Sequence, residues 1–402
     1  MTLRYSTDIV IFGGGIAGLW LLNRLQNIGY SPLLFETNTL GGGQTLASQG
    51  IIHGGLKYAL SGSLTQASEV IADMPSVWRQ HLSGQGEPDL TGVPVLSNHY
   101  YMWSHGSLRS KLKAFLGSRS LTGRIEVVKE ETYPEIFSGI TSKGTLYQLP
   151  DFVIHTPSLL ERLREPVANR LLAIKEGIYQ FKINTQNDKH ILKIDINGEQ
   201  IVIEAERFIF CAGAGNKQLI EKTGIERTSA QERPLHMVYL KDSDLPQLYS
   251  HFIGDDFSLT PELTVTSHTG LDGQTVWYLG GNLAEEGVNK GRDEQILSAK
   301  HLLDKFLPWI DTATASWDCF SINRAEANIN NKYRPDDAYI SVESNIILGW
   351  PTKLTLAPSL VNKVVKIITE GEDPVPAIDN SGAIAALNEL LGNPEPAKAR
   401  WD

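Results

Sequence analysis

The sequence predicts an α/β fold that begins with a Rossmann-like dinucleotide-binding unit. Three observations predict it. Residues 8–12, Asp-Ile-Val-Ile-Phe, have the short, apolar, β-branched pattern of a buried strand and run directly into glycines. An apolar helical pattern follows and stops at Gly29. A second apolar strand pattern, residues 31–35, ends at Glu36. A strand, a glycine turn, a helix, a strand and a terminal acid form the order of a unit that binds an adenine dinucleotide.

The glycine turn has the spacing G-x-G-x-x-G at Gly13, Gly15 and Gly18. The first glycine permits a tight turn, the second lets the backbone approach a pyrophosphate, and the third lets the helix pack close to the strand. The helix N-terminus attracts the phosphate charge, and Glu36 offers hydrogen-bond acceptors to a ribose. The alternative is an ordinary glycine-rich turn of an α/β protein. The neighbouring residues expected to contact the dinucleotide are Ile16, Ala17 and Thr37.

Composition and charge restrict the class of protein. The 402 residues carry a formal net charge of −10, which argues against a nucleic-acid partner because phosphates require a basic surface. No stretch reaches the roughly 18 uninterrupted apolar residues of a membrane span, and the N-terminus lacks the pattern of a secretory signal. The two cysteines, Cys211 and Cys319, give neither a disulfide framework nor the spacing of metal ligands. We therefore expect no metal, no transmembrane segment and a cytoplasmic location.

Further elements follow from the apolar patterns and from turn residues. The patterns up to residue 211 predict a helix over residues 63–82 broken at Pro75, strands near 100–103, a helix capped by Thr156, one hairpin over 178–204 that turns at 197–198, and a strand over 207–211 that enters a glycine turn. The patterns after it predict strands over 231–282, a helix at 293–307, a strand at 345–348 and a helix containing 360–368. The residues after Gly371 are rich in Pro, Ala and Asn, and we expect a loosely attached tail.

These elements predict a discontinuous two-domain arrangement that is typical of flavoproteins. The chain returns to a glycine-rich turn after strand 207–211 and again after strand 345–348. We expect a Rossmann-like FAD-binding domain from residues 1–62, 151–225 and 329–402, the last part including the tail. We expect a substrate domain with a large mixed β-sheet from residues 63–150 and 226–328.

Four blocks of sequence resemble the D-amino-acid oxidase superfamily of FAD-dependent oxidoreductases, which includes glycine oxidase, glycerol-3-phosphate dehydrogenase and L-2-hydroxyglutarate dehydrogenase. The blocks are residues 9–36, residues 41–58 with their Ile-His-Gly-Gly sequence, residues 210–215, and residues 348–358 ending in Ala-Pro. In relatives the last block reads Gly-His followed by a second glycine, whereas this chain has Gly-Trp-Pro.

The resemblance implies FAD as the cofactor. In some relatives a His or Cys in the segment around Ser48 binds the flavin covalently; no such residue stands there, so we expect non-covalent FAD. The resemblance further implies cofactor contacts from two turns and one loop segment: Gln44, Thr45, Ser48, Gln49, Gly50, Ala212, Gly213, Gly349, Thr352, Lys353 and Leu354.

Three residues are candidates for catalysis. His53 is suited to take a proton near neutral pH, although a histidine that caps a turn or fills the core is the alternative. Arg324 matches the position of the family's substrate arginine and would bind an anionic group, or else would form an ion pair with Glu326 or a neighbour. The alternative position for this element is Arg334, ten residues later. Lys353 would face the flavin edge where negative charge develops. We expect His53 and Arg324 to act together on one substrate.

The predicted function is an FAD-dependent oxidoreductase that transfers a hydride to flavin from a small, anionic hydroxy acid, polyol phosphate or amine. One alternative is an amino-acid or amine oxidase of the glycine oxidase type. Another is an FAD-binding protein with lost or changed catalysis, which the altered C-terminal turn favours. The expected partners are a small-molecule substrate and an unidentified electron acceptor, and we expect a monomer or a small homo-oligomer.

Overall fold

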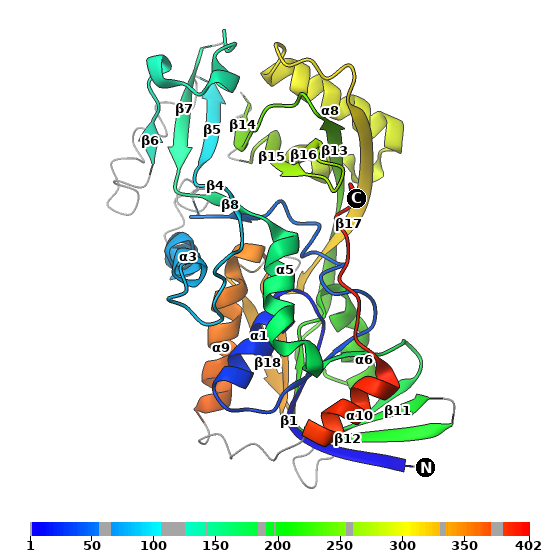
Figure 1. Cartoon of the computed structure of the whole chain (residues 1–402). Coiled ribbons are helices and arrows are strands. Elements are labelled where there is room, and N and C mark those ends of the chain that lie inside the picture. Colours follow the sequence, from blue (N-terminus) through cyan, green and yellow to red (C-terminus); the bar gives the residue numbers. More distant parts are fainter. Residues whose placement is uncertain are drawn as a thin grey trace.

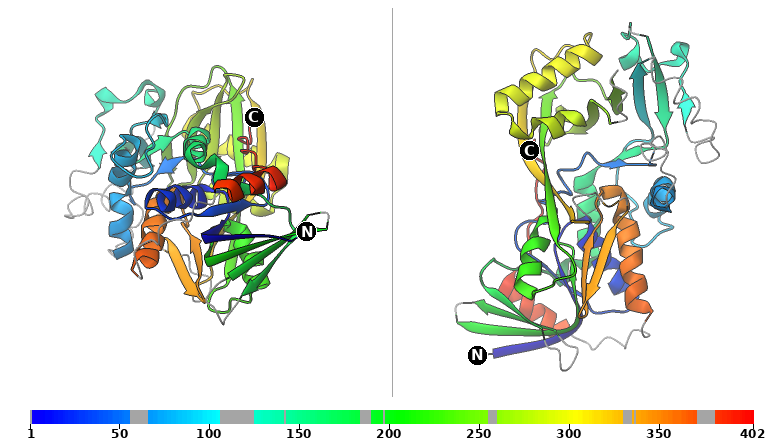
Figure 2. Two further views of the ribbon diagram at one scale, coloured as in Figure 1. Left: turned by 60° about the horizontal axis from the view of Figure 1, so that its bottom comes forward. Right: turned by 180° about the vertical axis from the view of Figure 1, so that it is seen from behind.

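The structure is a computed structural model that describes residues 2–55, 66–105, 125–141, 143–183, 190–196, 198–254, 260–329, 335, 337–370 and 381–402. Figure 1 shows an elongated molecule with one large β-sheet toward each end, which we call the lower and the upper sheet. The view from behind in Figure 2 shows the same arrangement, with α9 beside the lower half and α8 beside the upper half. The predicted α/β class with a large mixed sheet is confirmed.

The lower sheet has a parallel core built from distant segments. β1 (Thr2–Phe12) pairs in parallel with β2 (Leu33–Glu36) on one side and with β12 (Glu199–Phe210) on the other. β12 also pairs in parallel with β19 (Ile346–Trp350), and β2 with β9 (Leu171–Ala173). The carboxyl ends of parallel strands meet at one edge of a sheet, so the turns that follow β1, β2, β12 and β19 gather there.

Antiparallel strands extend this core. β10 (Tyr179–Ile183), β11 (His190–Ile196) and β12 form three consecutive antiparallel strands, so the prediction of one hairpin over 178–204 is wrong by one strand. Residues 184–189 and 197 lie outside the described part of the chain. β18 (Tyr339–Glu343) pairs antiparallel with β19.

Four helices share an apolar core with one face of the lower sheet: α1 (Ile16–Asn27), α3 (Gln66–Leu82), α5 (Thr156–Arg164) and α9 (Ala357–Thr369). The indole of Trp20 on α1 meets that of Trp78 on α3 edge-on, with ring centroids 4.9 Å apart. α3 continues through Pro75 without the predicted break. A proline removes one helical hydrogen bond, and burial of the flanking Met74 and Trp78 offsets that loss. The N-cap of α5 is His155 rather than the predicted Thr156, because the His155 ring accepts the N–H of Ser158.

The upper sheet runs in the order β17-β13-β16-β15-β14-β5-β7-β6. It is mixed, because β14 and β5 pair in parallel while the other neighbours pair antiparallel. Helix α8 (Arg292–Phe306) covers the apolar face of this sheet and corresponds to the helix predicted at 293–307. The strands are β5 (Tyr100–His105), β6 (Glu126–Val127), β7 (Gly144–Leu149), β13 (Ala230–Asp242), β14 (Ser250–Ile253), β15 (Leu263–Thr269), β16 (Thr275–Gly280) and β17 (Ser316–Ala327).

A three-stranded sheet, β3 (Ile51–Ile52), β8 (Phe152–Ile154) and β4 (Val95–Ser97), lies between the two halves (Figure 1). The remaining elements are the helices α6 (Asn216–Thr223), α7 (Asn282–Glu286) and α10 (Ser381–Leu391), and the 3-10 turns η2 (Glu130–Thr132), η3 (Glu135–Phe137), η4 (Glu165–Arg170), η5 (Gly213–Gly215), η6 (Gly287–Asn289) and η7 (Leu354–Leu356).

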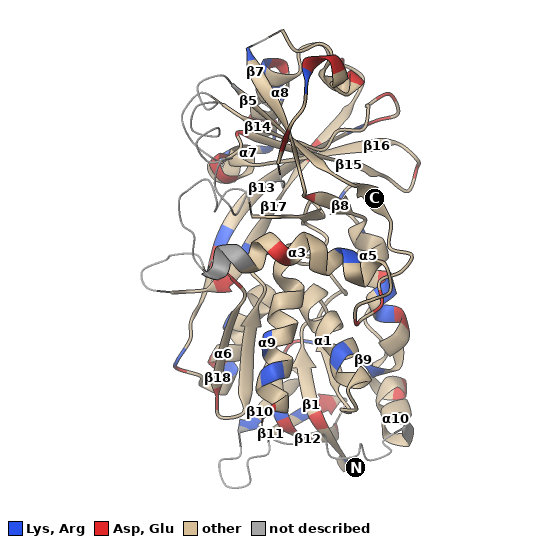
Figure 3. Ribbon diagram, turned by 90° about the vertical axis from the view of Figure 1, so that its left-hand side faces the viewer, with Lys and Arg blue, Asp and Glu red and all other residues tan. Residues whose placement is uncertain are grey.

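Charged residues of both signs are interspersed along the described elements in the view of Figure 3. Several of them pair across elements, for example Arg162 with Asp89 at 2.9 Å and Lys305 with Glu262 at 2.6 Å. Among the described residues, none of the helices combines the length and apolarity that crossing a membrane demands.

Residues 381–402, the described part of the tail that was expected to be loose, are docked along both halves, which contradicts that expectation. Ile384 and Leu387 of α10 are buried in the core of the lower sheet. Farther along, the N–H of Leu40 donates to the carbonyl of Glu395 at 2.8 Å. Trp401 is 8% exposed and packs on Tyr278 of the upper sheet, with ring centroids 5.3 Å apart. The composition of the tail misled the prediction because a few large apolar residues provide its anchors.

We predict that α10 contributes to global stability. Leu387→Ala removes a side chain that is 1% exposed and should cost about 2–4 kcal/mol of unfolding free energy. Leu390→Ala, in the same helix but 38% exposed, is the matched control and should cost less than about 1 kcal/mol. Thermal and denaturant unfolding measure both variants. Equal effects of the two substitutions would show that α10 is not docked as described.

Candidate active site

Two glycines of the first turn occupy positions that admit no side chain. Gly13 has a φ of +108°, and a Cβ there would lie 2.5 Å from the Cα of Ala212 in the second turn. A Cβ on Gly18 would lie 1.9 Å from the carbonyl oxygen of Gly13. Both distances are far below van der Waals contact. The sequence therefore needs glycine here to bring α1, β1 and the second turn together.

Gly15 opens the N-terminus of α1 to a ligand. It is the N-cap residue, with φ −80° and ψ −175°, and a Cβ there would meet only Thr45 Oγ1 of the described residues within 4 Å, at 3.2 Å. No acidic side chain lies in the first turn of α1. The Thr45 hydroxyl accepts the N–H of Ile16 at 3.0 Å, and Ala17 is buried in the same turn. A phosphate-bearing group fits this cradle, because the helix N-terminus carries partial positive charge.

Glu36 is fixed at the end of β2 beside the glycine turn. Its Oε2 accepts the N–H of Gly14 at 2.6 Å, and its Oε1 accepts the N–H of Asn38 at 2.9 Å. An ionised carboxylate has further lone pairs, so Glu36 retains acceptor capacity for a ribose. The sequence analysis missed the role of Gly14, although the run of three consecutive glycines was the available signal. Thr37 follows Glu36 at this edge.

The second and the C-terminal turns are tied together by two side chains. Asn216 is fully buried: its Oδ1 accepts the N–H of Ala212 at 2.8 Å, and its Nδ2 donates to the carbonyl of Gly349 at 3.2 Å. The indole N–H of Trp350 donates to the carbonyl of Gly213 at 3.1 Å. Sequence reasoning did not identify either side chain. Trp350 occupies the position at which relatives were expected to have histidine. Its indole connects the C-terminal turn to the second turn at this edge of the sheet.

The C-terminal turn continues from Trp350 into η7 and α9. Thr352 has a φ of +60° and is 7% exposed, and the N–H of Lys353 donates to the carbonyl of Pro351 at 2.7 Å. Leu354 begins the 3-10 turn that leads into α9. The turn thus brings Thr352, Lys353 and Leu354 to the same edge as Gly349.

The segment from Gln44 to Gly50 crosses beneath the upper sheet. Gln44 Oε1 accepts the N–H of Ala325 on β17 at 2.8 Å. The Ser48 hydroxyl donates to the carbonyl of Thr45 within the segment, at 2.7 Å. Gln49 Nε2 donates to the carbonyl of Tyr278 on β16 at 2.8 Å. Gln44 and Gln49 therefore join the two halves of the molecule, a role that the sequence analysis did not foresee.

His53 lies at the end of that segment, where the two halves meet. Its N–H donates to the hydroxyl of Thr355 in the C-terminal turn at 2.9 Å. Its ring Nδ1 lies 3.2 Å from Oδ2 of Asp151, which is 3% exposed. The imidazole itself is 33% exposed, so a small ligand has access to it. The turn-cap and core alternatives for His53 do not describe this partly open ring paired with a carboxylate.

A second histidine packs beside His53. His251 on β14 lies parallel to the His53 ring, with centroids 6.2 Å apart and planes 10° apart. Burial, with the nearby His53 as a smaller cause, lowers the pKa of His251 to about 3, so this ring is neutral at physiological pH. The side-chain atoms of His53, Asp151 and His251 that could bind a metal ion all lie within 4.8 Å of one another. The sequence analysis did not predict that these three residues lie together.

Arg324 lies on a different strand of the upper sheet from β14, the strand that packs beside His53. Arg324 on β17 forms an ion pair with Glu285 at 3.1 Å, while Glu326 pairs with Arg233 instead. Three strands lie between β17 and β14, which carries His251. Four strand spacings amount to about 19 Å along the sheet. Arg334 and residues 56–58 of the segment expected to face the flavin lie outside the described residues.

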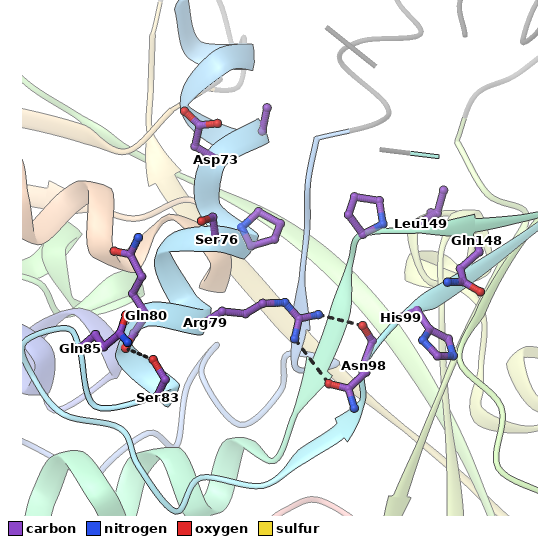
Figure 4. A pocket seen from close by; sticks show the side chains of 13 residues that line it. Asp73, Ser76, Arg79, Gln80, Ser83, Gln85, Asn98, His99, Gln148 and Leu149 are labelled. Carbon is purple, nitrogen blue, oxygen red and sulfur yellow. Dashed lines mark hydrogen bonds between the residues drawn. The ribbon is translucent and has the colours of Figure 1, made fainter. Parts of the chain in front are cut away.

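A pocket of about 680 Å³ lies between α3 and the strands of the upper half (Figure 4). Arg79 on its wall donates to the carbonyl of Asn98 at 2.8 Å, and its guanidinium lies over the ring of Phe152. Pro75 and Pro150 also line the pocket. If Gly54 carried a Cβ, that atom would lie 3.5 Å from Cγ of Pro75 and 3.1 Å from Cγ of Pro150. The pocket therefore lies beside Gly54, the residue that follows His53 in the chain.

Comparison with known proteins gives a consistent result. A family model for FAD-dependent oxidoreductases (DAO) matches residues 8–328. The probable FAD-dependent oxidoreductase PA4991 of Pseudomonas aeruginosa is 43% identical over 377 residues, which cover 92% of this chain and 93% of that protein. Its crystal structure superposes with a TM-score of 0.82 and 38% identity over 100% of this chain and 99% of that one.

Two solved structures share the fold at lower identity. Glycine oxidase from Geobacillus kaustophilus has a TM-score of 0.65 with 15% identity, covering 92% of this chain and 96% of its own. L-α-Glycerophosphate oxidase from Mycoplasma pneumoniae, solved with FAD bound, has a TM-score of 0.66 with 14% identity, covering 98% and 100%. At these identities the likeness concerns the fold alone.

We predict that Gly15→Val abolishes FAD binding, because its side chain would enter the space above the helix N-terminus. Gly291→Val is the matched control: Gly291 is also an N-cap glycine with extended backbone, at φ −69° and ψ 167°. The flavin-to-protein absorbance ratio after incubation with FAD measures both. We expect less than about a tenth of the wild-type ratio for Gly15→Val and an unchanged ratio for the control. Full flavin content in Gly15→Val would mean that the dinucleotide binds elsewhere.

Proposed function

The chain belongs to the DAO family of FAD-dependent oxidoreductases, and from that premise we propose that it oxidises a small anionic substrate by hydride transfer to the flavin. The glycine cradle at α1, Glu36, and the turns at Gly213 and Gly349 are the residues that would hold the dinucleotide. Bound FAD would supply the acceptor for a hydride, which carries both electrons of the oxidation.

The observation that carries this proposal is the position of His53. It lies between the C-terminal turn, through Thr355, and the upper sheet, through the stacked ring of His251. Its ring is partly exposed and pairs with the buried carboxylate of Asp151. An imidazole at such a junction can take the proton that a substrate hydroxyl or amine loses when its neighbouring C–H bond is oxidised.

A cation near His53 would bind the anionic group of the substrate. Lys353 is better situated for this than Arg324, because it precedes by two residues the Thr355 hydroxyl that accepts the His53 N–H. Arg324 already pairs with Glu285 and lies beside the opposite end of the Gln44–His53 segment. A charge-assisted contact from Lys353 would also stabilise negative charge that develops nearby during reduction.

The test is anaerobic bleaching of the bound flavin by a panel of small 2-hydroxy acids, glycerol phosphate and amino acids. We expect at least one anionic member to bleach the wild-type flavin. His53→Gln should keep its flavin but slow bleaching at saturating substrate by about 10²-fold or more, because a general base contributes that much. Bleaching by amino acids alone would favour the glycine oxidase type of reaction. A panel with no active member would contradict the proposal.

Substitution of Lys353 tests the anionic subsite separately. Lys353→Met should raise the half-saturation concentration for the active substrate about 10- to 100-fold, because a charged hydrogen bond is lost. Lys363→Met, on the neighbouring helix α9 with its ammonium paired to Asp337 at 2.5 Å, is the matched control and should leave that concentration unchanged. Stopped-flow reduction over a range of substrate concentrations measures both. Equal values for the wild type and Lys353→Met would remove Lys353 from the site.

A further inference from the structure

Asp151 is a buried carboxylate committed to the residues around His53. It lies between β7 and β8 and is 3% exposed. Its Oδ1 accepts the N–H of Gly54 at 2.8 Å, and its Oδ2 lies 3.2 Å from Nδ1 of His53. Both oxygens thus engage the same two-residue stretch of chain. A carboxylate so deeply buried requires such partners, because an unpaired buried charge is strongly unfavourable.

This pairing fixes the tautomer of His53. An ionised carboxylate only accepts hydrogen bonds, so beside an ionised Asp151 the Nδ1 atom would carry the hydrogen and donate it to that carboxylate. Nε2 of the neutral ring then holds the lone pair. The backbone N–H of His53, held by Thr355, fixes the position of the same residue from the other side. His53 therefore presents one defined basic atom.

His251 supports this arrangement without competing for the proton. Its ring is stacked on His53, packs on Tyr100 with centroids 4.5 Å apart, and has Nδ1 3.0 Å from the hydroxyl of Thr264. Because His251 is neutral, it leaves the negative charge of Asp151 available to His53. A His53 ring that gains a proton would face one carboxylate and one neutral imidazole.

We infer that Asp151 is a positioning residue that presents His53 Nε2 as the base, and that this pair selects a substrate whose reacting group is a hydroxyl rather than an amine. The inference rests on the proposed function. In the step, the substrate O–H bond breaks and its proton goes to Nε2. The electron pair of the adjacent C–H bond leaves as hydride to the flavin, and a carbonyl forms. The positive charge on His53 is balanced by Asp151.

The preference for a hydroxyl follows from proton affinities. An alcohol holds its proton about as tightly as water, so its oxidation benefits from a positioned base. An α-ammonium group is a far stronger acid than an alcohol, so an amino acid can bind as the free base without help from the protein. A buried Asp–His pair would therefore assist mainly the oxidation of alcohols.

The first measurement is stopped-flow flavin reduction by a 2-hydroxy acid and by the amino acid of the same carbon skeleton. The hydroxy acid should reduce the flavin and the amino acid should not. Asp151→Asn should lower the saturating rate about 100-fold with less than about a threefold change in half-saturation concentration, because general-base positioning acts on the chemical step. Asp8→Asn, which alters another carboxylate that accepts a backbone N–H (Ser31, 2.6 Å), is the matched control and should keep the wild-type rate.

A double-mutant cycle separates positioning from a structural defect. If Asp151 acts through His53, adding Asp151→Asn to His53→Gln should slow reduction no further. A second readout needs no substrate: diethyl pyrocarbonate acylates an unprotonated imidazole nitrogen, and peptide mass spectrometry follows the reaction at His53. Asp151→Asn should slow this acylation several-fold. Should that variant fail to fold, Asp151→Ser, which keeps a hydroxyl acceptor, replaces it in both measurements.

Several results would overturn the inference. The first is a wild-type rate of flavin reduction in Asp151→Asn, and the second is additive effects of the two substitutions in the double-mutant cycle. The third is reduction by the amino acid in preference to the hydroxy acid. The fourth is stoichiometric zinc or iron that binds the wild type but not Asp151→Asn, because the cluster would then be a metal centre. A wild-type flavin that no member of the panel reduces would contradict the proposed function instead. In that case the acylation of His53 still decides whether Asp151 positions it.

Discussion

The backbone contact at Gly13 is the constraint on which the rest of the structure depends. No side chain fits between Gly13 and Ala212, and none fits between Gly18 and Gly13. This closeness brings the start of α1, the end of β1 and the second turn to one point at the edge of the lower sheet. Asn216 and Trp350 then attach the C-terminal turn to the same point. The proposed cofactor cradle is therefore a product of backbone packing more than of side-chain chemistry.

The proposed catalytic chemistry depends on a different kind of contact, the one between the two halves of the molecule. Gln44 and Gln49 reach from one segment to β17 and β16 through side-chain to backbone hydrogen bonds. Their segment ends at His53, whose partners come from the loop before β8, from β14 and from the C-terminal turn. Each partner belongs to a different part of the sequence. The ring of His53 is thus oriented only when both halves are in place.

The difference between these two kinds of contact explains what the sequence predicted. Gly13, Gly18 and Glu36 carry a local pattern with fixed spacing, so the first unit was predictable from a short window, and so were regular elements such as α8. Asp151 and His251 lie about 100 and 200 residues after His53, and nothing near either residue marks it as a partner of that histidine. Arg324 was placed by motif, but its pairing with Glu285 depends on the course of β16 into α7. Composition also misjudged the tail, because Leu387 and Trp401 outweigh its many small residues.

The pairing of β1 with β12 has a consequence for how the chain is made. The first strand ends at Phe12, and its parallel partner begins at Glu199. At a synthesis rate of about 5–20 residues per second, the ribosome needs roughly 10–40 s to supply that partner. During this interval one edge of β1, which ends in the buried apolar residues 9–12, has no partner strand. Nascent chains of this protein should therefore bind ribosome-associated chaperones. A chain that is truncated before residue 199 should aggregate, because β1 then has no partner strand on that edge.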